Sequence, residues 1–300
     1  MTSFDQKRIF VTGGTGFFGK SLLDFLKSSK CRAELWLLSR DPDGFRRRHP
    51  EYANHPGWHF WKGDARDFPL PPVGFDYVIH AASCAADDPD VVCFTCTSAI
   101  RVLELASRSG ARTVFLSSGA VYGPLSRPAL ETDIPMPATP YGHAKLAAEQ
   151  LFLESGLPAA AARCFSFIGP HISSGTGYAA ADFLAAAAEH RPLRITGNAE
   201  TVRSYLSAGN WAAWILALLK NGGGVWNVGS PLPVSVGELA GRIAALRGLP
   251  VEDCGIAAAS YYVPDVDKIR REFRLEVPAD PIPEIEKTLQ TFENIRKKTP

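Results

Sequence analysis

Tyr141 and Lys145 are four residues apart in the segment Tyr141-Gly142-His143-Ala144-Lys145, so a helix there would place both side chains on one face. A free tyrosine has a pKa of about 10 and is a poor base at neutral pH. A neighbouring lysine ammonium and an oxidised nicotinamide would both favour the phenolate and lower that pKa. With a serine hydroxyl from a nearby strand end to orient the reacting oxygen, such a pair suits proton removal coupled to hydride transfer.

A glycine-rich segment, TGGTGFFG at positions 12–19, follows a short apolar run and precedes a helical pattern. Gly13 permits a tight turn, Gly16 lets the backbone approach a pyrophosphate, and Gly19 allows a helix to pack closely on a sheet. The start of the helix offers unpaired N–H groups to the phosphates. An isolated glycine triplet can also be a structural turn, but between a strand and a helix it predicts dinucleotide binding. The expected contacts are Gly13, Thr15, Gly16, Phe17, Phe18 and Gly19.

Two further strand ends carry candidate cofactor contacts. Ser39 and Arg40 end the second apolar run, where an acid would otherwise bind the ribose of NAD. A hydroxyl and a cation at this position favour binding of the 2′-phosphate of NADP. The alternative is that Arg40 is a surface charge. Asp64 and Ala65 follow the third run, and the Asp64 carboxylate could accept from an adenine amino group or simply form a turn.

Apolar runs alternate with helical patterns through the first half of the chain. This alternation predicts an α/β fold with a doubly wound, parallel Rossmann-type sheet and a smaller C-terminal substrate-binding cap. We expect a dinucleotide-binding domain over 1–166, joined again by 201–228, and a cap mainly over 167–300. Residues 41–57 are expected to form a polar loop, in which Arg46 to Arg48 are either solvated or contact a cofactor phosphate. The expected strands are 8–11, 34–38, 58–61, 75–80, 114–117 and 159–164, and the expected early helices are 17–26, 91–107 and 141–153.

The composition excludes several classes of protein. Lys and Arg number 32 against 31 Asp and Glu, a balance that argues against a dedicated nucleic-acid binder. Six cysteines are too few for a disulfide scaffold, and no apolar stretch is long enough for a membrane span. Cys93 and Cys96 have no second pair and are expected to be buried thiols, so no metal site is predicted. We expect a soluble cytoplasmic protein with neither nucleic acid nor membrane as a partner.

The order of several motifs resembles the extended short-chain dehydrogenase/reductase family, in its NAD(P)-dependent nucleotide-sugar epimerase/dehydratase branch. The resemblance covers nearly the whole chain and implies that Ser118, Tyr141 and Lys145 are catalytic. It also implies that the backbone at His80, Ala81 and Ala82 passes the cofactor, that Arg203 contacts a substrate diphosphate, and that the protein is a homodimer. The motifs are TGGTGFFG, GDARD, IHAAS, FLSSGAVYG, YGHAK, RCFSFIGP, VRSYL and WNVGS.

The chain departs from the pattern of that branch at informative positions. Gly119 and Ala120 stand where dehydratases carry an acid pair, so 4,6-dehydration is not expected and decarboxylation is doubtful. Ser166 replaces an asparagine that usually reaches the substrate, which leaves a smaller contact. His171, in the loop after Gly-Pro, is a candidate substrate contact or a surface residue.

The resemblance implies hydride exchange at C4 of a nucleoside-diphosphate sugar, and the Gly119-Ala120 turn fits both an epimerase and a reductase. The SSGAVYG turn is closest to that of the 4-epimerases and favours C4 epimerisation through transient hydride transfer. The alternative reaction is NADPH-dependent reduction of a 4-keto nucleotide sugar, which Arg40 favours. A non-catalytic dinucleotide sensor on the same fold is a third hypothesis, although a sensor has no need of Ser118, Tyr141 and Lys145. The cofactor is NAD or NADP, with Arg40 favouring NADP.

Overall fold

The computed structural model describes residues 4–175, 178–276 and 282–298. These form two compact units. The first comprises Met1–Gly123, Ile134–Cys164 and Ala212–Trp226, and the second comprises Pro124–Asp133, Phe165–Trp211 and Asn227–Pro300. No helix of the described residues is long and apolar enough to cross a bilayer.

A seven-stranded sheet is the centre of the first unit, with strand order β11-β6-β5-β4-β1-β2-β3. Neighbouring strands from β6 to β3 pair in parallel. The chain builds outward from β1 to β3 and then reverses to build β4, β5 and β6, which confirms the doubly wound sheet. In such sheets ligands bind at the carboxyl ends of the strands where the order reverses, here between β1 and β4. The strands are β1 Arg8–Thr12, β2 Glu34–Ser39, β3 Trp58–Lys62, β4 Tyr77–His80, β5 Arg112–Ser118, β6 Ala159–Cys164 and β11 Gly224–Val228.

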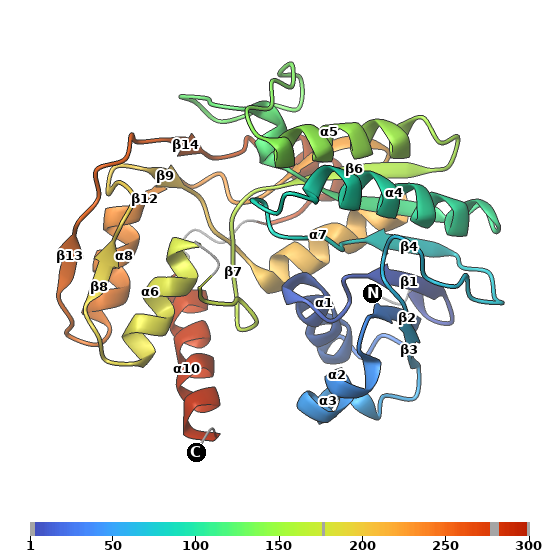
Figure 1. Cartoon of the computed structure of the whole chain (residues 1–300), viewed down its shortest axis with the longest axis horizontal. Coiled ribbons are helices and arrows are strands. Elements are labelled where there is room, and N and C mark those ends of the chain that lie inside the picture. The colour runs from blue at the N-terminus through green and yellow to red at the C-terminus, as the bar shows by residue number, and fades with distance from the viewer. Residues whose placement is uncertain (1–3, 176–177, 277–281, 299–300) are drawn as a thin grey trace. The chain divides into compact units, whose positions relative to one another are not determined.

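Helices cover both faces of this sheet (Figure 1). The helices α4 (Val91–Ser107) and α5 (Pro140–Leu153) lie side by side over one face, and α1 (Phe17–Ser28) covers the other. The start of α5 is fixed locally, because Thr139 Oγ1 accepts from the Gly142 N–H at 3.1 Å and proline occupies the first turn. Beneath α4 and α5 a buried aromatic core holds the helices on the sheet, with Phe10, Phe68, Phe75, Phe115 and Phe152 among its members.

The expectation of a polar loop over residues 41–57 was wrong, because two short helices lie there. They are α2 (Pro42–Arg48) and α3 (Pro50–Ala53). Asp41 caps α2, its carboxylate accepting from the Gly44 N–H at 2.9 Å, and the basic run occupies the last turn, where cations complement the helix dipole. In the sequence, charged residues surround Phe45 and Tyr52, the two aromatic side chains of these helices that are buried in the structure, and so mask the helical pattern.

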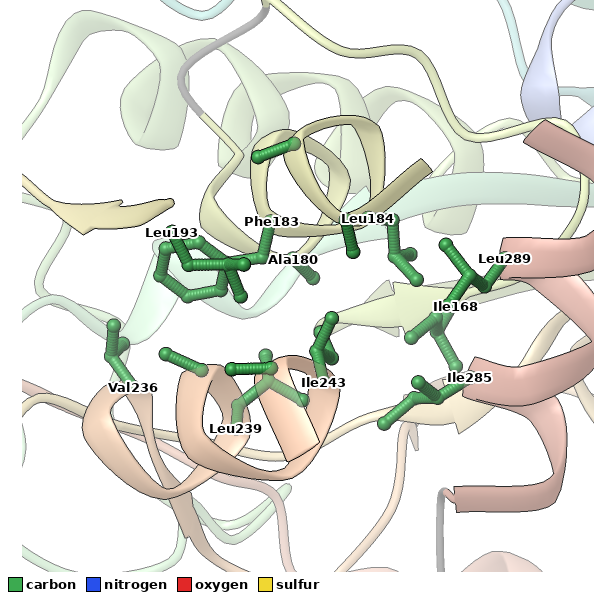
Figure 2. Close-up of a cluster of buried hydrophobic side chains, with 14 of the residues drawn as sticks. Ile168, Ala180, Phe183, Leu184, Leu193, Val236, Leu239, Ile243, Ile285 and Leu289 are labelled. Carbon is green, nitrogen blue, oxygen red and sulfur yellow. The ribbon is translucent and has the colours of Figure 1, made fainter. Parts of the chain in front are cut away.

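The second unit is built from helices and short strands around its own core. Figure 2 shows Phe183 and Leu184 of α6 (Ala179–Ala188) opposite Leu239 and Ile243 of α8 (Val236–Ala245). Leu289 of α10 (Ile282–Lys298) completes the same core. Other elements are α9 (Asp267–Phe273) and the small sheets β10-β7, β12-β9-β14 and β13-β8. The strands are β7 Phe167–Ile168, β8 Leu193–Ile195, β9 Val202–Arg203, β10 Leu206–Ser207, β12 Val234–Ser235, β13 Val251–Asp253 and β14 Tyr261–Tyr262, and α7 (Ala208–Asn221) spans the border of the two units.

Candidate active site

A cavity of about 630 Å³ lies in the first unit, at the carboxyl ends of β1, β2, β3 and β4. The structure gathers most of the expected cofactor contacts around it, from four separate strand ends. Its lining includes Gly13, Thr15, Gly16, Phe17, Phe18, Ser39, Arg40, Asp64, Ala65, Ala81 and Ala82. Gly19 and His80 support this wall from behind, without being among the lining residues.

Gly13 holds the glycine loop against the end of β4. Its φ is +69°, which favours glycine, and a Cβ there would lie 2.7 Å from the carbonyl carbon of Ala81. Gly19 is equally constrained, because its Cβ would lie 2.2 Å from the Gly14 carbonyl carbon. The helix α1 begins immediately after this loop with neither a side-chain cap nor an acidic residue in its first turn. Its N–H groups therefore face the cavity as a site suited to an anionic group.

His80 stabilises the same wall through a buried hydrogen-bond chain. Thr12 Oγ1 accepts from the backbone N–H groups of Ala81 and Ala82, at 3.2 and 3.1 Å, so its own proton goes to His80 Nδ1 at 2.7 Å. His80 Nε2 then carries the ring proton and donates to Ser98 Oγ at 3.2 Å. Burial lowers the pKa of His80 to about 3, which keeps the imidazole neutral. The ring acts on the cavity through the backbone that it holds.

The far end of the cavity contains two residues that sequence reasoning missed, Arg66 and Phe94. Arg66 Nε donates to the Asp64 carboxylate at 2.8 Å, and this hydrogen bond is the main cause that lowers the pKa of Asp64. The Arg66 guanidinium also lies 5.5 Å from the centroid of the Phe94 ring. The position of Arg66 two residues after Asp64 was the available signal.

The basic run does not reach this cavity. Arg46 pairs with Asp43 and lies 4.9 Å from the centroid of the Phe60 ring, and Arg48 lies 3.6 Å from the Asp41 carboxylate. Arg40 does line the cavity and is exposed there. Arg40, and not the basic run, is therefore the cation placed for a ligand's phosphate at the end of β2.

Ser118, Tyr141 and Lys145 come together where β5 meets α5. Ser118 ends β5 and caps the short helix η2 (Gly119–Tyr122), its Oγ accepting from the Ala120 N–H at 3.1 Å. Lys145 is buried, donates from Nζ to the Leu116 carbonyl at 3.0 Å, and lies 5.5 Å from the centroid of the Tyr141 ring. The carboxyl end of one strand and the first turns of one helix thus supply all three groups.

The electrostatic environment of this trio is dominated by burial. Burial raises the pKa of Tyr141 to about 12, while a hydrogen bond with Ser118 acts to lower it. Burial also lowers the pKa of Lys145 to about 8. Cys84, which sequence reasoning missed, lines the cavity and interacts electrostatically with both Tyr141 and Lys145. Ser118, Tyr141 and Lys145 are not among the residues that line the cavity, and Cys84 is the lining residue that interacts with two of them.

The remaining candidates, Ser166, His171 and Arg203, lie in the second unit. Ser166 is buried and hydrogen-bonds Tyr178, and His171 is partly buried. Arg203 donates to the Val202 carbonyl at 2.9 Å and to Ser260 Oγ at 3.0 Å. A second cavity of about 350 Å³, not foreseen from the sequence, lies in this unit with Asp182, Arg191, Arg194 and Thr196 among its lining residues.

The cysteine expectation was partly wrong. Cys93 is exposed on α4 rather than buried, and Cys96 is intermediate. No cluster of potential metal ligands is present in the ranges that the structure describes.

Comparison with known proteins identifies relatives over most of the chain. The model of the NAD dependent epimerase/dehydratase family matches residues 9–229. UDP-glucuronic acid decarboxylase 1 of Xenopus tropicalis is 27% identical over 261 residues, 81% of this chain, and the match spans 61% of the relative's length. GDP-6-deoxy-D-mannose reductase of Pseudomonas aeruginosa is 28% identical over 265 residues, 82% of each chain.

Solved structures resemble the fold over nearly its full length. The epimerase Mth375 of Methanothermobacter thermautotrophicus gives a TM-score of 0.83 at 26% identity, covering 99% of this chain and 96% of its own. UDP-N-acetylglucosamine 4-epimerase of Methanobrevibacter ruminantium, in complex with UDP-N-acetylmuramic acid, gives 0.86 at 20% identity, covering 97% and 99%. At 20% identity the second likeness concerns the fold alone.

Proposed function

The chain belongs to the NAD-dependent epimerase/dehydratase family, and we propose that it interconverts the C4 epimers of a nucleoside-diphosphate sugar. The cavity fits a dinucleotide: a glycine with no room for a Cβ lies beside an uncapped helix start, where a pyrophosphate is favoured. Gly13, Gly16 and the first turn of α1 would hold the pyrophosphate, and Lys145 would hold the nicotinamide ribose. Bound NAD would supply the acceptance of a hydride from C4 and its return.

The observation that carries the proposal is the hydrogen bond between Ser118 and Tyr141, with Lys145 buried beside the Tyr141 ring. Tyr141 removes the proton of the C4 hydroxyl and later returns it to the reduced oxygen. Ser118 orients that oxygen. A Tyr141 pKa of about 12 is too high for a base at neutral pH, so the positive charges of Lys145 and the oxidised nicotinamide must lower it.

The residues around Ser118 fit hydride exchange, by an epimerase or a reductase, better than the loss of water from the sugar. The resemblance of the SSGAVYG turn to that of the 4-epimerases supports epimerisation. Gly119 and Ala120 form the η2 turn directly after Ser118, and neither side chain can transfer a proton. Water loss from the sugar needs a side chain that can transfer a proton. A turn without such a group is sufficient for a reaction that consists only of hydride exchange.

One observation favours a second reaction, NADPH-dependent reduction of a 4-keto nucleotide sugar. Arg40 lines the cavity at the end of β2, where it would bind a 2′-phosphate. The relative named a GDP-6-deoxy-D-mannose reductase matches this chain over 82% of its length. We therefore propose NADP as an accepted cofactor beside NAD.

The second unit is proposed as the substrate-binding cap, with Ser166, His171 and Arg203 as contacts for the sugar and its diphosphate. Arg203 suits that role because a guanidinium binds phosphate oxygens in a bidentate manner. We also propose a homodimer, supported by two large apolar side chains exposed on α4, Val92 and Ile100. None of the six cysteines, all in described segments, forms a disulfide, which agrees with the proposed cytoplasmic location.

Product analysis tests the reaction. Purified protein is incubated with UDP-, dTDP- and GDP-sugars, with and without NADPH, and the sugars are identified by NMR. We expect a C4 epimer to form without consumption of NADPH. Stoichiometric oxidation of NADPH with a 4-keto sugar would replace the epimerase by the reductase, and carbon dioxide from UDP-glucuronic acid would replace it by a decarboxylase.

A further inference from the structure

A buried ion pair lies one helical turn beyond Lys145 on α5. The side chains of Glu149 and Arg163 are 2% and 5% exposed, whereas those of a surface pair such as Lys7 and Asp76 are 36–45% exposed. Arg163 donates from Nη2 to Glu149 Oε2 at 2.8 Å and from Nε to Oε1 at 3.0 Å, so the contact is bidentate. Ser117 donates from Oγ to the same carboxylate at 2.5 Å.

This cluster joins the segments that carry the trio. Ser117 directly precedes Ser118 on β5, and Glu149 is on α5, four residues after Lys145 and eight after Tyr141. Arg163 is on β6 and lies 4.6 Å from the centroid of the Tyr122 ring, which ends η2. One group of three side chains therefore contacts β5, α5, β6 and the η2 turn.

Large apolar side chains are few where α5 meets β6, although Phe152 of α5 packs on Phe115 of β5. Four consecutive alanines, Ala159 to Ala162, form most of β6, and α5 carries Ala144, Ala147 and Ala148. Helix position is normally fixed by large side chains that interlock, and methyl groups offer few such contacts. A bidentate ion pair is directional where alanine packing is not.

Energetics also points to a geometric role. Burying two charges costs about as much as their attraction returns, so a buried pair adds little net stability. A helix rises about 1.5 Å per residue, and a hydrogen bond is lost when donor and acceptor separate beyond about 3.5 Å. A shift of α5 by one residue's rise would therefore separate Tyr141 from Ser118.

We propose that Glu149, Arg163 and Ser117 are positioning residues that fix α5 on β5 and β6, so that the Tyr141 hydroxyl meets Ser118 and stays beside Lys145. The proposal rests on the catalytic trio of the proposed function. It assigns no substrate or cofactor contact to the three residues, which act only through the elements that they join.

The test removes the cluster at constant net charge, in the triple variant Ser117→Ala/Glu149→Leu/Arg163→Met. Because apolar replacement of a buried pair is often neutral or stabilising, we expect Tm to be equal or higher. The dissociation constant for NAD should not change. On a sugar that the wild type accepts, kcat should fall about 100-fold with KM little altered, as for a reacting group displaced by about 1 Å.

A second measurement needs no substrate. The ionisation of Tyr141 in the NAD complex is followed by ultraviolet absorbance, as the difference between each protein and the same protein carrying Tyr141→Phe. Loss of the Ser118 contact and displacement from Lys145 should move this titration about one unit higher in pH. The control is Glu154→Leu, which removes an exposed charge from the residue directly after α5 and should change neither kcat nor the titration.

The outcomes separate the two proposals. If the triple variant folds and keeps both wild-type kcat and the Tyr141 titration, the cluster is only structural and the inference is wrong. If the variant does not fold, Glu149→Gln replaces it. Its Tm should fall because the buried charge of Arg163 loses its partner. Its kcat, measured well below that Tm, should also fall, and an unchanged kcat would overturn the inference. If Tyr141→Phe alone retains full turnover, the proposed function fails. The titration then still tests whether the cluster positions α5.

Discussion

In the first unit, the groups proposed for catalysis contact one another. In the second unit, Arg203, proposed to bind the diphosphate, donates its hydrogen bonds to residues with no proposed function. A hydrogen bond joins Ser118 and Tyr141. Lys145 lies beside the Tyr141 ring and donates to the Leu116 carbonyl of β5. Arg203 instead donates to the carbonyl of Val202, its neighbour on β9, and to Ser260, which directly precedes β14. We infer that the acid–base geometry is set before a ligand arrives, while diphosphate binding exchanges existing hydrogen bonds. On the proposed function, chemistry would lie on the preorganised side and recognition on the adaptable side.

The comparison would be broken most directly by Tyr141→Phe. Removing the phenol hydroxyl should lower kcat by about 10²–10⁴-fold, while the dissociation constant for NAD changes little because the ring still packs. Steady-state kinetics and calorimetry measure the two quantities. His143→Ala, an exposed neighbour on the same helix, is the control. Retention of more than half the wild-type turnover would remove Tyr141 from the mechanism.

Lys145→Met tests whether the buried ammonium is held at a cost in stability. The folded pKa of Lys145 is about 8, below its ordinary 10.5, so between these values the folded state binds fewer protons. Below pH 8 the full cost of burying the charge is present, and it is relieved as the pH rises to 10.5. We expect the unfolding free energy of wild type relative to the variant to rise by about 3 kcal/mol across this window.

Urea unfolding at several pH values, without added dinucleotide, measures that difference. A difference that is flat between pH 8 and 10.5 would mean that Lys145 titrates normally in the folded protein. The first-unit site would then be no more preorganised than the second.

Arg203→Ala sharpens the other side of the comparison. Loss of a charge-assisted contact should weaken UDP binding by about 1.5 kcal/mol, roughly tenfold, while NAD binding stays the same. Ser260→Ala is the matched variant, because it releases Arg203 Nη2 from an existing hydrogen bond and should leave UDP binding equal or tighter. Calorimetry with both ligands checks this, and equal losses for UDP and NAD would make Arg203 structural.

The smallest expected effect concerns Arg40→Asp. Since Arg40 is exposed, its contact with a 2′-phosphate is screened by solvent, and we expect the ratio of NADP to NAD affinity to fall by about tenfold. Arg46→Asp serves as the control, because Arg46 pairs with Asp43 and covers Phe60 away from the cavity. An unchanged ratio in Arg40→Asp would make Arg40 a surface charge and strengthen the case for bound NAD.

Much of the sheet was predictable because its signals are local. Strands covered on both faces read as short apolar runs, and the expected strand over 159–164 coincides with β6. The glycine spacing and the separation of Tyr141 from Lys145 are also local patterns. The helices α2 and α3 were missed because charged residues surround the few side chains that they bury, Phe45 and Tyr52.

Contacts between distant segments could not be read from the sequence. Glu149 meets Arg163 and Ser117 only because α5 folds back over β5 and β6. Phe94 and Cys84 enter the cavity through the order of the strands. Composition likewise gave no signal for the exposure of Cys93.

The central claim is that a hydride leaves C4 and returns to the same carbon on the opposite face. The most direct measurement is NMR of a nucleotide sugar accepted by the wild type and labelled with deuterium at C4, incubated without NADPH. The account predicts that the C4 epimer forms and that deuterium remains at C4 of the product. Loss of the label to solvent, or no epimer until NADPH is added and consumed, would contradict it.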